Sequence, residues 1–470
     1  MTRTSTLEMA CGVRVVTPDS LHLITPYVLY EQQDWFEDEI SFLRRVLMPG
    51  QQVIDVGASY GVYTLSVAKA VGPTGAVWAF EPASITATYL EQSIAANCFT
   101  QIVLERSAIS RDCGTAQLTI NDNSELNALV RGEGAGGASE TVRLVTLDDC
   151  LQRYGWKQID FLKIDAEGEE ANIIEGGRRF FSEQSPLILY EVKIGENVHI
   201  ELVGKFAALG FDSYRLVPGL DLLFPFDAAA KPDGFLLNLF CCKKDRANLL
   251  YDRGLLLDSA SIASYKAGNG FADFLEEHRY PYRWEAELAA LSYGAVFADL
   301  WRATTDQSAE VTDALACFAM SQDVDLPPLG RFLALERSFV TLVRVSQRQP
   351  QYMRLASLAR VARDYGARSV AVGALGQLSE KLLKNERLDL HEPFLAPGKR
   401  FDTIAPRPDI GSWIVASVLE EFERLGSFSS FFTGAAARGR LELITSLGYE
   451  SEEMRRRLQL IRIRFPKPSA

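Results

Sequence analysis

The sequence predicts an α/β protein with a doubly wound, mostly parallel sheet in its N-terminal half and an α-helical domain in its C-terminal half. Three observations support this prediction. Short apolar runs alternate with helical patterns between residues 51 and 190, a glycine turn follows the first run, and strand signals fade beyond residue 245. Such alternation is typical of right-handed βαβ crossovers, with helices on both faces of a sheet.

Five strands and four helices are expected before residue 210. The strands are residues 53–56, 75–80, 102–106, 159–164 and 187–190, and the helices are residues 62–71, 84–97, 171–181 and 202–209. Two further strands, 214–217 and 236–240, could pair antiparallel at one edge of the sheet. Residues 115–120 and 141–145 are expected as edge strands around a glycine-rich loop at Glu133 to Ser139.

Helical spacing replaces the strand pattern beyond about residue 245. Apolar residues recur every three or four positions between 355 and 365, and Gly366 is placed to end that helix before a returning one at 367–383. The chain shows no fixed repeat period. The sequence therefore predicts an α-helical domain whose hairpins could stack as in a repeat protein.

The length of 470 residues indicates more than one domain. A single core stops growing at roughly 250–300 residues. We expect an N-terminal extension or lid at 1–48, a sheet domain at 49–245 and the α-helical domain at 246–470.

The charge balance argues against a general nucleic-acid binder. The formal net charge is −12, whereas phosphate binding draws on clustered Lys and Arg. One basic run, from Arg455 to Arg464, is expected to be the solvated face of a terminal helix.

The cysteines and the apolar runs favour a cytoplasmic protein. Seven scattered cysteines with no Cys-x-x-Cys pair argue against a zinc ribbon or a disulfide framework. The first dozen residues lack the apolar core of a signal peptide, and no run reaches the ~18 apolar residues that a membrane helix needs. We expect no membrane span.

The most informative motif is the turn after the first strand, where residues 53–65 read VIDVGASYGVYTL. Asp55 ends the strand, and Gly57 and Gly61 permit a tight turn into the next helix. Ser59 stands where a dinucleotide site needs glycine for close approach of a pyrophosphate. The turn therefore favours an adenosine-type cofactor without a pyrophosphate over a nicotinamide or flavin dinucleotide.

Two carboxylates are expected beside this turn. Asp55 could receive a cationic group of the cofactor, and Glu81, at the end of the second strand in AFEP, could accept hydrogen bonds from both hydroxyls of a ribose. Alternatively, Gly57 only makes a strand-to-helix turn and Glu81 is a solvated loop residue. Their place at strand ends, where open α/β sheets bind ligands, favours a site.

A second group of acids follows the fourth strand, in FLKIDAEGEE at residues 161–170. Asp165 is expected at the same sheet edge, with Lys163 on the same side of the strand and Glu167 in the next turn. Alternatively, Asp165 caps the following helix, which would contribute roughly 0.5–2 kcal/mol, while the glutamates complement the helix dipole. Lys163 could serve only to neutralise a neighbouring acid.

Glu191 ends the fifth strand in LYEVK, and His199 follows it. Asp165 and Glu191 could accept a proton from a hydroxyl or hold a divalent metal together. Such a metal would be oxygen-liganded, like magnesium, because no histidine ligand is evident. A site without metal is the favoured prediction. His199 is the best-placed neutral base, although a lone histidine is more often structural or exposed.

Taken together, these motifs resemble the FkbM family of class I S-adenosylmethionine-dependent methyltransferases. The matching segments are VIDVGASYGVYTL, AFEP, the region of Asn97, FLKIDAEGEE, LYEVK and YRLVPGL. The resemblance covers about residues 12–245. It implies a Rossmann-like, seven-stranded, mostly parallel sheet whose last strand is antiparallel, and S-adenosylmethionine as the cofactor.

The resemblance also implies a role for each matching residue. Asp55, Gly57, Ala58 and Gly61 would bind the methionine part of the cofactor, Glu81 the ribose, Ser107 and Ala108 the adenine, and Asp165 would lie near the reacting methyl group. The candidate catalytic bases are Asp165 and Glu191, with His199 third.

The reaction implied by the resemblance is O-methylation of a hydroxyl on a sugar, a glycan or a natural product. Two alternatives stay open: a non-catalytic S-adenosylmethionine-binding scaffold, and another nucleotide-dependent enzyme such as a dehydrogenase. The helical domain could hold the acceptor, form a homo-oligomer or bind a protein partner, and its residues do not choose among these roles.

Overall fold

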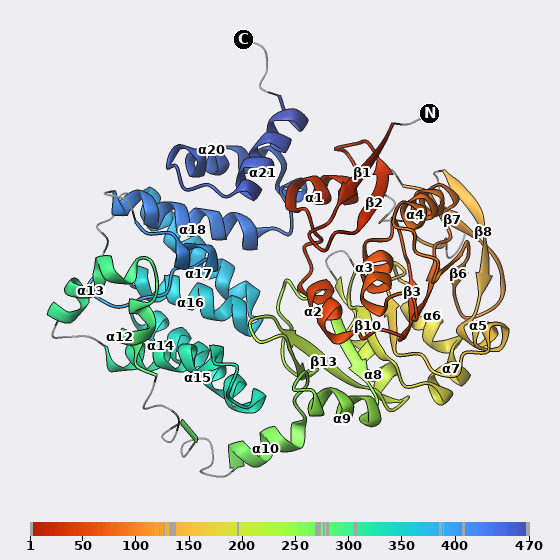
Figure 1. Cartoon of the computed structure of the whole chain (residues 1–470), viewed down its shortest axis with the longest axis horizontal. Coiled ribbons are helices and arrows are strands. Elements are labelled where there is room, and N and C mark those ends of the chain that lie inside the picture. The colour runs from red at the N-terminus through yellow and green to blue at the C-terminus, as the bar shows by residue number, and fades with distance from the viewer. Residues whose placement is uncertain are drawn as a thin grey trace. The chain divides into compact units, whose positions relative to one another are not determined.

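A computed structural model gives the fold of the chain (Figure 1). It describes residues 3–121, 123, 125, 127–130, 138–194, 197–267, 274–275, 278, 282–304, 308–384, 388, 390–406 and 409–466. Most of the glycine-rich loop predicted at Glu133 to Ser139 lies outside these residues.

The chain forms two compact units. The first unit is Met1–Leu216, Pro225–Pro232 and Leu236–Arg253, and the second is Val217–Phe224, Asp233–Phe235 and Gly254–Ala470. The first unit thus includes the extension expected at 1–48. The functional limits of the domains stay a prediction.

The first unit is built on a mostly parallel sheet. In spatial order the strands of the sheet are β14 (Leu222–Pro225), β13 (Asp212–Val217), β15 (Asn238–Cys242), β10 (Leu187–Glu191), β9 (Phe161–Ile164), β3 (Gln52–Val56), β4 (Ala76–Phe80) and β5 (Ile102–Glu105). The first three residues of β14 are assigned to the second unit. The pairs from β10 to β5 are parallel, and β15 is antiparallel to both of its neighbours. The predicted α/β class and the antiparallel last strand are therefore confirmed.

Among the described residues the sheet has eight strands, one more than the seven predicted. The additional strand, β14, follows β13 after a short turn and lies at the sheet edge. Its sequence stands in a proline-containing stretch that was expected to be a loop, and it ends in Pro225. Proline is tolerated at an edge because it has no N–H group to give to a neighbouring strand.

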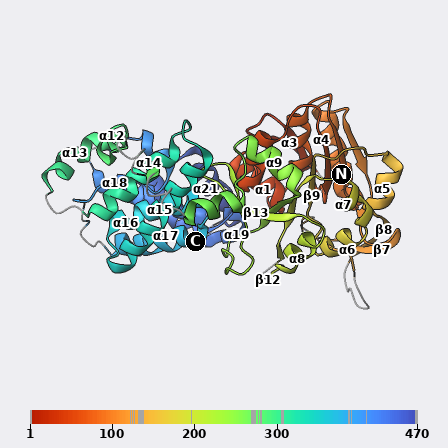
Figure 2. The ribbon, with the colours of Figure 1, turned by 90° about the horizontal axis from the view of Figure 1, so that it is seen from below.

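Helices cover both faces of this sheet. In Figure 2, α3 (Val62–Val71), α4 (Ser84–Ala96) and α9 (Lys244–Asp252) lie on one side, and α6 (Glu170–Glu175) and α8 (Glu201–Ala207) on the other. The core on the second side also includes residues of α5 (Leu147–Tyr154) and α7 (Arg178–Glu183). Burial of aromatic side chains such as Phe180, Phe181 and Phe206 holds these helices on the strands.

Several smaller elements surround the sheet. They are the antiparallel pair β1 (Thr4–Glu8) and β2 (Arg14–Pro18), the helices α1 (Ile24–Gln32) and α2 (Asp38–Val46), the short pair β11 (Lys193–Ile194) and β12 (Asn197–Val198), and the strands β6 (Ala108–Ile109), β7 (Gly114–Thr119) and β8 (Ser139–Val145). The last three form a separate sheet in the order β6-β8-β7. The strands expected at 115–120 and 141–145 are thus not edges of the main sheet.

The helix expected at 171–181 is divided into α6 and α7 at Gly176 and Gly177. A Cβ atom at position 176 would lie 2.3 Å from the carbonyl oxygen of Ser110. This close backbone approach needs glycine, and two adjacent glycines weaken a helix.

Apart from the residues of β14, the regular elements of the second unit are helices in the part of the chain that the structure describes. Its elements are α10 (Ser259–Ala267), α12 (Trp284–Ala289), α13 (Gly294–Ala303), α14 (Ala309–Gln322), α15 (Pro328–Arg348), α16 (Tyr352–Tyr365), α17 (Arg368–Leu383), α18 (Ile410–Gly426), α19 (Ser430–Thr433), α20 (Arg438–Ser446), α21 (Glu452–Arg464) and the 3-10 helices η2 (Lys399–Thr403) and η3 (Gly434–Ala437). Successive helices from α14 to α18 pack on one another. Gly366 ends α16 in the left-handed conformation, as predicted.

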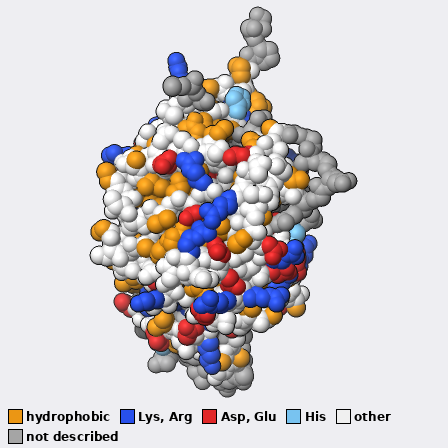
Figure 3. All heavy atoms as spheres, turned by 90° about the vertical axis from the view of Figure 1, so that its right-hand side faces the viewer, with side chains coloured by type: hydrophobic (Ala, Val, Ile, Leu, Met, Phe, Trp, Pro, Cys, Tyr) orange, Lys and Arg blue, Asp and Glu red, His pale blue; other side chains and the backbone are white. Residues whose placement is uncertain are grey.

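Two general properties bear on function. On the face seen in Figure 3, Lys and Arg side chains lie among Asp and Glu side chains and hydrophobic ones. Among the described helices, none is long and apolar enough to cross a membrane.

Candidate active site

The glycine turn after β3 lies directly against the end of β9. Gly57 and Gly61 both have positive φ angles, +79° and +94°. A Cβ atom at position 57 would lie 1.7 Å from the carbonyl oxygen of Asp165, so only glycine allows this approach. Packing alone therefore explains Gly57, and the same packing places the turn beside Asp165. Ala58 is buried next to it.

Asp55 is a buried carboxylate with an unused oxygen. Its side chain is 1% exposed, and its Oδ2 accepts a hydrogen bond of 2.5 Å from the Thr64 hydroxyl on α3. Its Oδ1 is buried without a hydrogen-bond partner among the described residues. Burial raises the pKa of Asp55, and the nearby Lys163 opposes that rise. A cationic ligand would give this oxygen the partner that the protein does not supply.

Glu81 ties the end of β4 to the glycine turn. Its two carboxylate oxygens accept hydrogen bonds of 2.9 Å from the backbone N–H groups of Ser59 and Ala83. Burial raises the pKa of Glu81 to about 7 despite these bonds. Because each carboxylate oxygen can accept more than one hydrogen bond, Glu81 retains capacity for ribose hydroxyls.

The positions predicted beside an adenine are buried as well. Ser107 is 1% exposed, and its Oγ is buried without a hydrogen-bond partner among the described residues. Ala108 begins β6. The unused oxygens of Asp55 and Ser107 match the donor groups of an adenosine-type cofactor with a cationic part, so the residues present fit S-adenosylmethionine.

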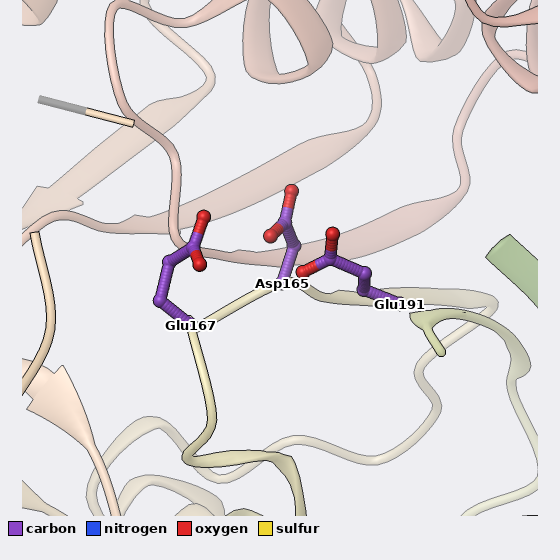
Figure 4. Close-up of side chains that lie close together, drawn as sticks. All are labelled: Asp165, Glu167 and Glu191. Atoms are coloured by element: carbon purple, nitrogen blue, oxygen red, sulfur yellow. The ribbon is translucent and has the colours of Figure 1, made fainter. Parts of the chain in front are cut away.

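Three carboxylates from the ends of β9 and β10 come together. Asp165, Glu167 and Glu191 each offer one oxygen within 4.8 Å of the others (Figure 4). In Figure 4, Asp165 lies between the other two side chains, and all three project to the same side. The structure thus brings together the two acids proposed as catalytic bases and adds Glu167 to them.

Asp165 is held by a buried lysine. Lys163 Nζ lies 2.6 Å from Oδ2 of Asp165, and the Lys163 side chain is 5% exposed whereas that of Asp165 is 39% exposed. The helix after β9 is not capped by Asp165, because α6 begins at Glu170 and its N-cap residue is Glu169. The capping alternative for Asp165 is therefore wrong.

The neighbours of Asp165 retain protons more readily than ordinary glutamates. Burial, followed by repulsion from Asp165, raises the pKa of Glu167 to about 8 and that of Glu191 to about 11. Oε2 of Glu191 is buried without a hydrogen-bond partner among the described residues. The raised pKa of Glu191 thus favours its protonated form near neutral pH.

His199 does not join this group of carboxylates. Its Nδ1 lies 2.6 Å from Oε1 of Glu201, and its side chain is 35% exposed. The structure thus gives His199 a solvent-accessible partner, as for a surface histidine.

The three carboxylates could hold an oxygen-liganded divalent cation such as magnesium. Lys163 already pairs with one oxygen of Asp165, so a cation would compete with its ammonium group. A site without metal stays a prediction.

Sequence reasoning missed Glu37 and Tyr63. The carboxylate of Glu37, at the start of α2, accepts hydrogen bonds from the Tyr63 hydroxyl, from Trp35 Nε1 at 3.0 Å and from Asn238 Nδ2 at 3.1 Å. Burial raises the pKa of Glu37 most, and Asp165 contributes to that rise. Tyr63 stood inside the glycine-turn motif, whereas no local pattern pointed to Glu37.

Part of the chain is similar to known methyltransferases. Residues 55–212 match the family defined by the methyltransferase FkbM domain. Methyltransferase sdnD of Sordaria araneosa is 30% identical to the chain over 154 residues, a match that covers 26% of this chain and 59% of that protein. The chain thus spans less than two thirds of the length of this curated relative.

Two of the solved structures that match part of the chain are described as methyltransferases. A SAM-dependent O-methyltransferase from Thermotoga maritima is 14% identical and covers 51% of this chain and 77% of its own, with a TM-score of 0.25. A putative methyltransferase from Streptococcus mutans in complex with SAH is 10% identical and covers 44% and 95%, with a TM-score of 0.27. Because these scores are low, the assignment rests on the family match and on the strand order of this sheet.

That strand order, with a glycine turn and acids at the strand ends, defines a Rossmann-like methyltransferase domain. Residues 55–212 match the model of FkbM methyltransferase domains, so the resemblance predicted from the motifs is confirmed. The same match supports S-adenosylmethionine, the methyl donor of this class, as the cofactor.

Proposed function

We propose that the first unit transfers the methyl group of S-adenosylmethionine to a hydroxyl of a sugar, a glycan or a natural product. The observation that carries this proposal is the pairing of Asp165 with Lys163 beside two glutamates at the carboxyl edge of the sheet. A hydroxyl acceptor must lose a proton during methylation, and this arrangement places a lysine-paired carboxyl group where it would accept that proton.

The residues that would hold the cofactor follow the sheet edge. Asp55, Gly57, Ala58 and Gly61 would face its methionine part, Glu81 its ribose, and Ser107 and Ala108 its adenine. When bound, S-adenosylmethionine supplies an activated methyl group, which needs no further activation by the protein.

The chain's own residues would orient the acceptor and take its proton. The oxygen of Asp165 that is not paired with Lys163 would accept the proton of the acceptor hydroxyl. Glu191, protonated at rest, would donate a hydrogen bond to the acceptor or to Asp165. Orientation of the acceptor against the methyl group would supply much of the remaining acceleration.

Transfer of labelled methyl groups tests this proposal. The protein would be incubated with S-adenosylmethionine carrying a labelled methyl group and with a panel of glycosides or a cell extract. Asp165→Asn should lower kcat by about 10²–10⁴-fold and Glu191→Gln by less, with little change in the calorimetric Kd for S-adenosylmethionine. Near-normal turnover in both variants would contradict the proposed catalytic roles of Asp165 and Glu191.

Two other results would favour the alternatives. Tight binding of S-adenosylmethionine without methyl transfer to any acceptor would favour a scaffold. Binding of NAD but not of S-adenosylmethionine would favour a dehydrogenase. A cytoplasmic location stays a prediction.

A further inference from the structure

A chain of side-chain contacts leads from the N-terminal segment to Asp165. It starts at Glu37, which precedes α2, and passes through Tyr63 of α3 to Lys163 of β9. Asp165, where it ends, is the proposed base. The members come from three elements that only tertiary packing brings together.

The first link fixes the Tyr63 hydroxyl. Tyr63 is 7% exposed, and its hydroxyl donates a hydrogen bond to Oε2 of Glu37. Glu37 is itself oriented by Trp35 Nε1 and by Asn238 Nδ2, and Asn238 is the strand neighbour of Glu191. The hydrogen bond at its hydroxyl therefore fixes the position of the Tyr63 ring.

The second link fixes the lysine. Lys163 Nζ lies 4.9 Å from the centroid of the Tyr63 ring, a distance at which the ring face attracts a cation. Lys163 is paired in register with Asp55 across β3 and β9, and it forms its ion pair with Asp165. Its ammonium group thus has two carboxylates nearby, and the Tyr63 ring limits where it can lie.

The third link orients the base. Lys163 Nζ holds Oδ2 of Asp165 at 2.6 Å, while the Asp165 side chain as a whole is 39% exposed. One carboxylate oxygen is thus fixed, and the side chain remains accessible to an acceptor. A base misplaced by even 1 Å can cost about a hundredfold in rate, so a fixed oxygen matters for turnover.

We propose that Glu37 is a positioning residue for Asp165 and acts through Tyr63 and Lys163. This inference rests on the proposed function and deepens it. The N-terminal segment is then part of the catalytic apparatus, although Glu37 touches neither acceptor nor cofactor in this role.

A double-mutant cycle on the full-length protein tests the proposal. Glu37→Met removes the acceptor of the Tyr63 hydroxyl, and Tyr63→Phe removes the hydroxyl but retains the ring. Each should lower kcat about tenfold, and the double variant should be no slower than the slower single variant, because both break the same link. Glu37→Gln, which keeps one acceptor oxygen, should recover part of the loss.

Two measurements separate positioning from general damage. The calorimetric Kd for S-adenosylmethionine should stay within about threefold of the wild-type value in every variant. Tyr30→Phe is the matched control, because it also removes a tyrosine hydroxyl. The Tyr30 hydroxyl lies in the N-terminal segment and donates a hydrogen bond of 2.8 Å to Ser5 Oγ. This variant should turn over normally.

Losses that multiply in the double variant, or a parallel loss of cofactor affinity, would overturn the proposal. So would unchanged kcat in Tyr63→Phe while the wild type transfers methyl groups. If the wild-type protein transfers none, the proposed function fails first and this inference fails with it.

Discussion

Acidic side chains cluster in both units, but their partners differ. The strand-end carboxylates of the first unit are Asp55, Glu81, Asp165, Glu167 and Glu191. The arginine–glutamate cluster of the second unit consists of Glu420, Glu421, Glu423 and Glu453 with Arg400, Arg424, Arg440 and Arg457. Among the strand-end carboxylates Asp165 pairs with Lys163, whereas each glutamate of the cluster pairs with at least one arginine.

The pKa shifts follow this difference. Burial opposes ionisation of Glu453, but Arg424 and Arg457 outweigh it and lower the pKa. In the first unit burial prevails, and the pKa values of Glu81 and Glu167 rise to about 7 and about 8. Acids with raised pKa values at the end of a sheet indicate a place for a ligand or a reaction. Acids matched by arginines indicate a structural role.

Replacing a glutamate by glutamine should therefore change the free energy of unfolding by very different amounts in the two regions. Glu423 is 0% exposed and pairs with Arg440 at 2.7 Å and Arg457 at 3.5 Å. Glu423→Gln should lower the free energy of unfolding of the second unit by about 3–5 kcal/mol, because it leaves buried arginine charge uncompensated. Glu191→Gln should change that of the first unit by about 1 kcal/mol or less, because glutamine resembles the protonated acid.

Denaturant titration of both variants measures the difference. Arg462→Met provides a surface control in the second unit, since Arg462 pairs with Glu442 but is 56% exposed, and it should cost about 1 kcal/mol or less. Equal destabilisation by Glu423→Gln and Glu191→Gln would refute the division into structural and functional acids.

A smaller effect is expected at Asp55. Thr64→Val removes the hydrogen bond to Oδ2 of Asp55, whose Oδ1 already lacks a partner among the described residues. Leaving a buried acceptor unsatisfied should cost about 1–3 kcal/mol, to be measured as stability and as calorimetric affinity for S-adenosylmethionine. The control is Thr88→Val, because Thr88 is an exposed residue of α4. Its free energy of unfolding should change by less than about 0.5 kcal/mol. Equal effects at both positions would contradict a special role for Asp55.

The elements of the first unit could be predicted from the sequence where local signals were strong. The helix at 62–71 agrees with α3 residue for residue, because a glycine turn begins it and Gly72 follows its end. β14 could not be predicted, since its strand character comes from pairing with β13 rather than from its own residues. The break at Gly176 likewise depends on the distant backbone of Ser110.

The site shows the same division between local and tertiary information. The proximity of Asp165 and Glu191 could be predicted from the sequence, because parallel strands end at one edge of a sheet. Glu37 could not, because an acid at the start of a helix is usually explained by the helix dipole. Only the packing of α2 against α3 brings its carboxylate to the Tyr63 hydroxyl.

The two units should also respond to pH in opposite directions. In the folded first unit Glu81 and Glu167 bind protons up to pH values of about 7 and about 8, whereas unfolded glutamates lose theirs near pH 4.3. The folded state therefore binds more protons over this interval, and the stability of the first unit should fall as pH rises from about 4.5 to 8. Glu453 has a lowered pKa, so its contribution to the second unit is complete at neutral pH and is lost only as pH falls through the acidic range.

Calorimetric scans of the whole chain at pH 5.5 and pH 8 measure these responses. Added S-adenosylmethionine identifies the transition of the first unit, because a ligand that binds the folded state raises its Tm. That transition should move up at pH 5.5, by about 2–4 °C for each kcal/mol of added stability in a unit of this size, while the other moves little. Glu191→Gln should reduce the shift, since the pKa of Glu191 is also raised. Equal Tm shifts of both transitions between pH 5.5 and pH 8 would contradict this difference between the strand-end carboxylates and the arginine–glutamate cluster.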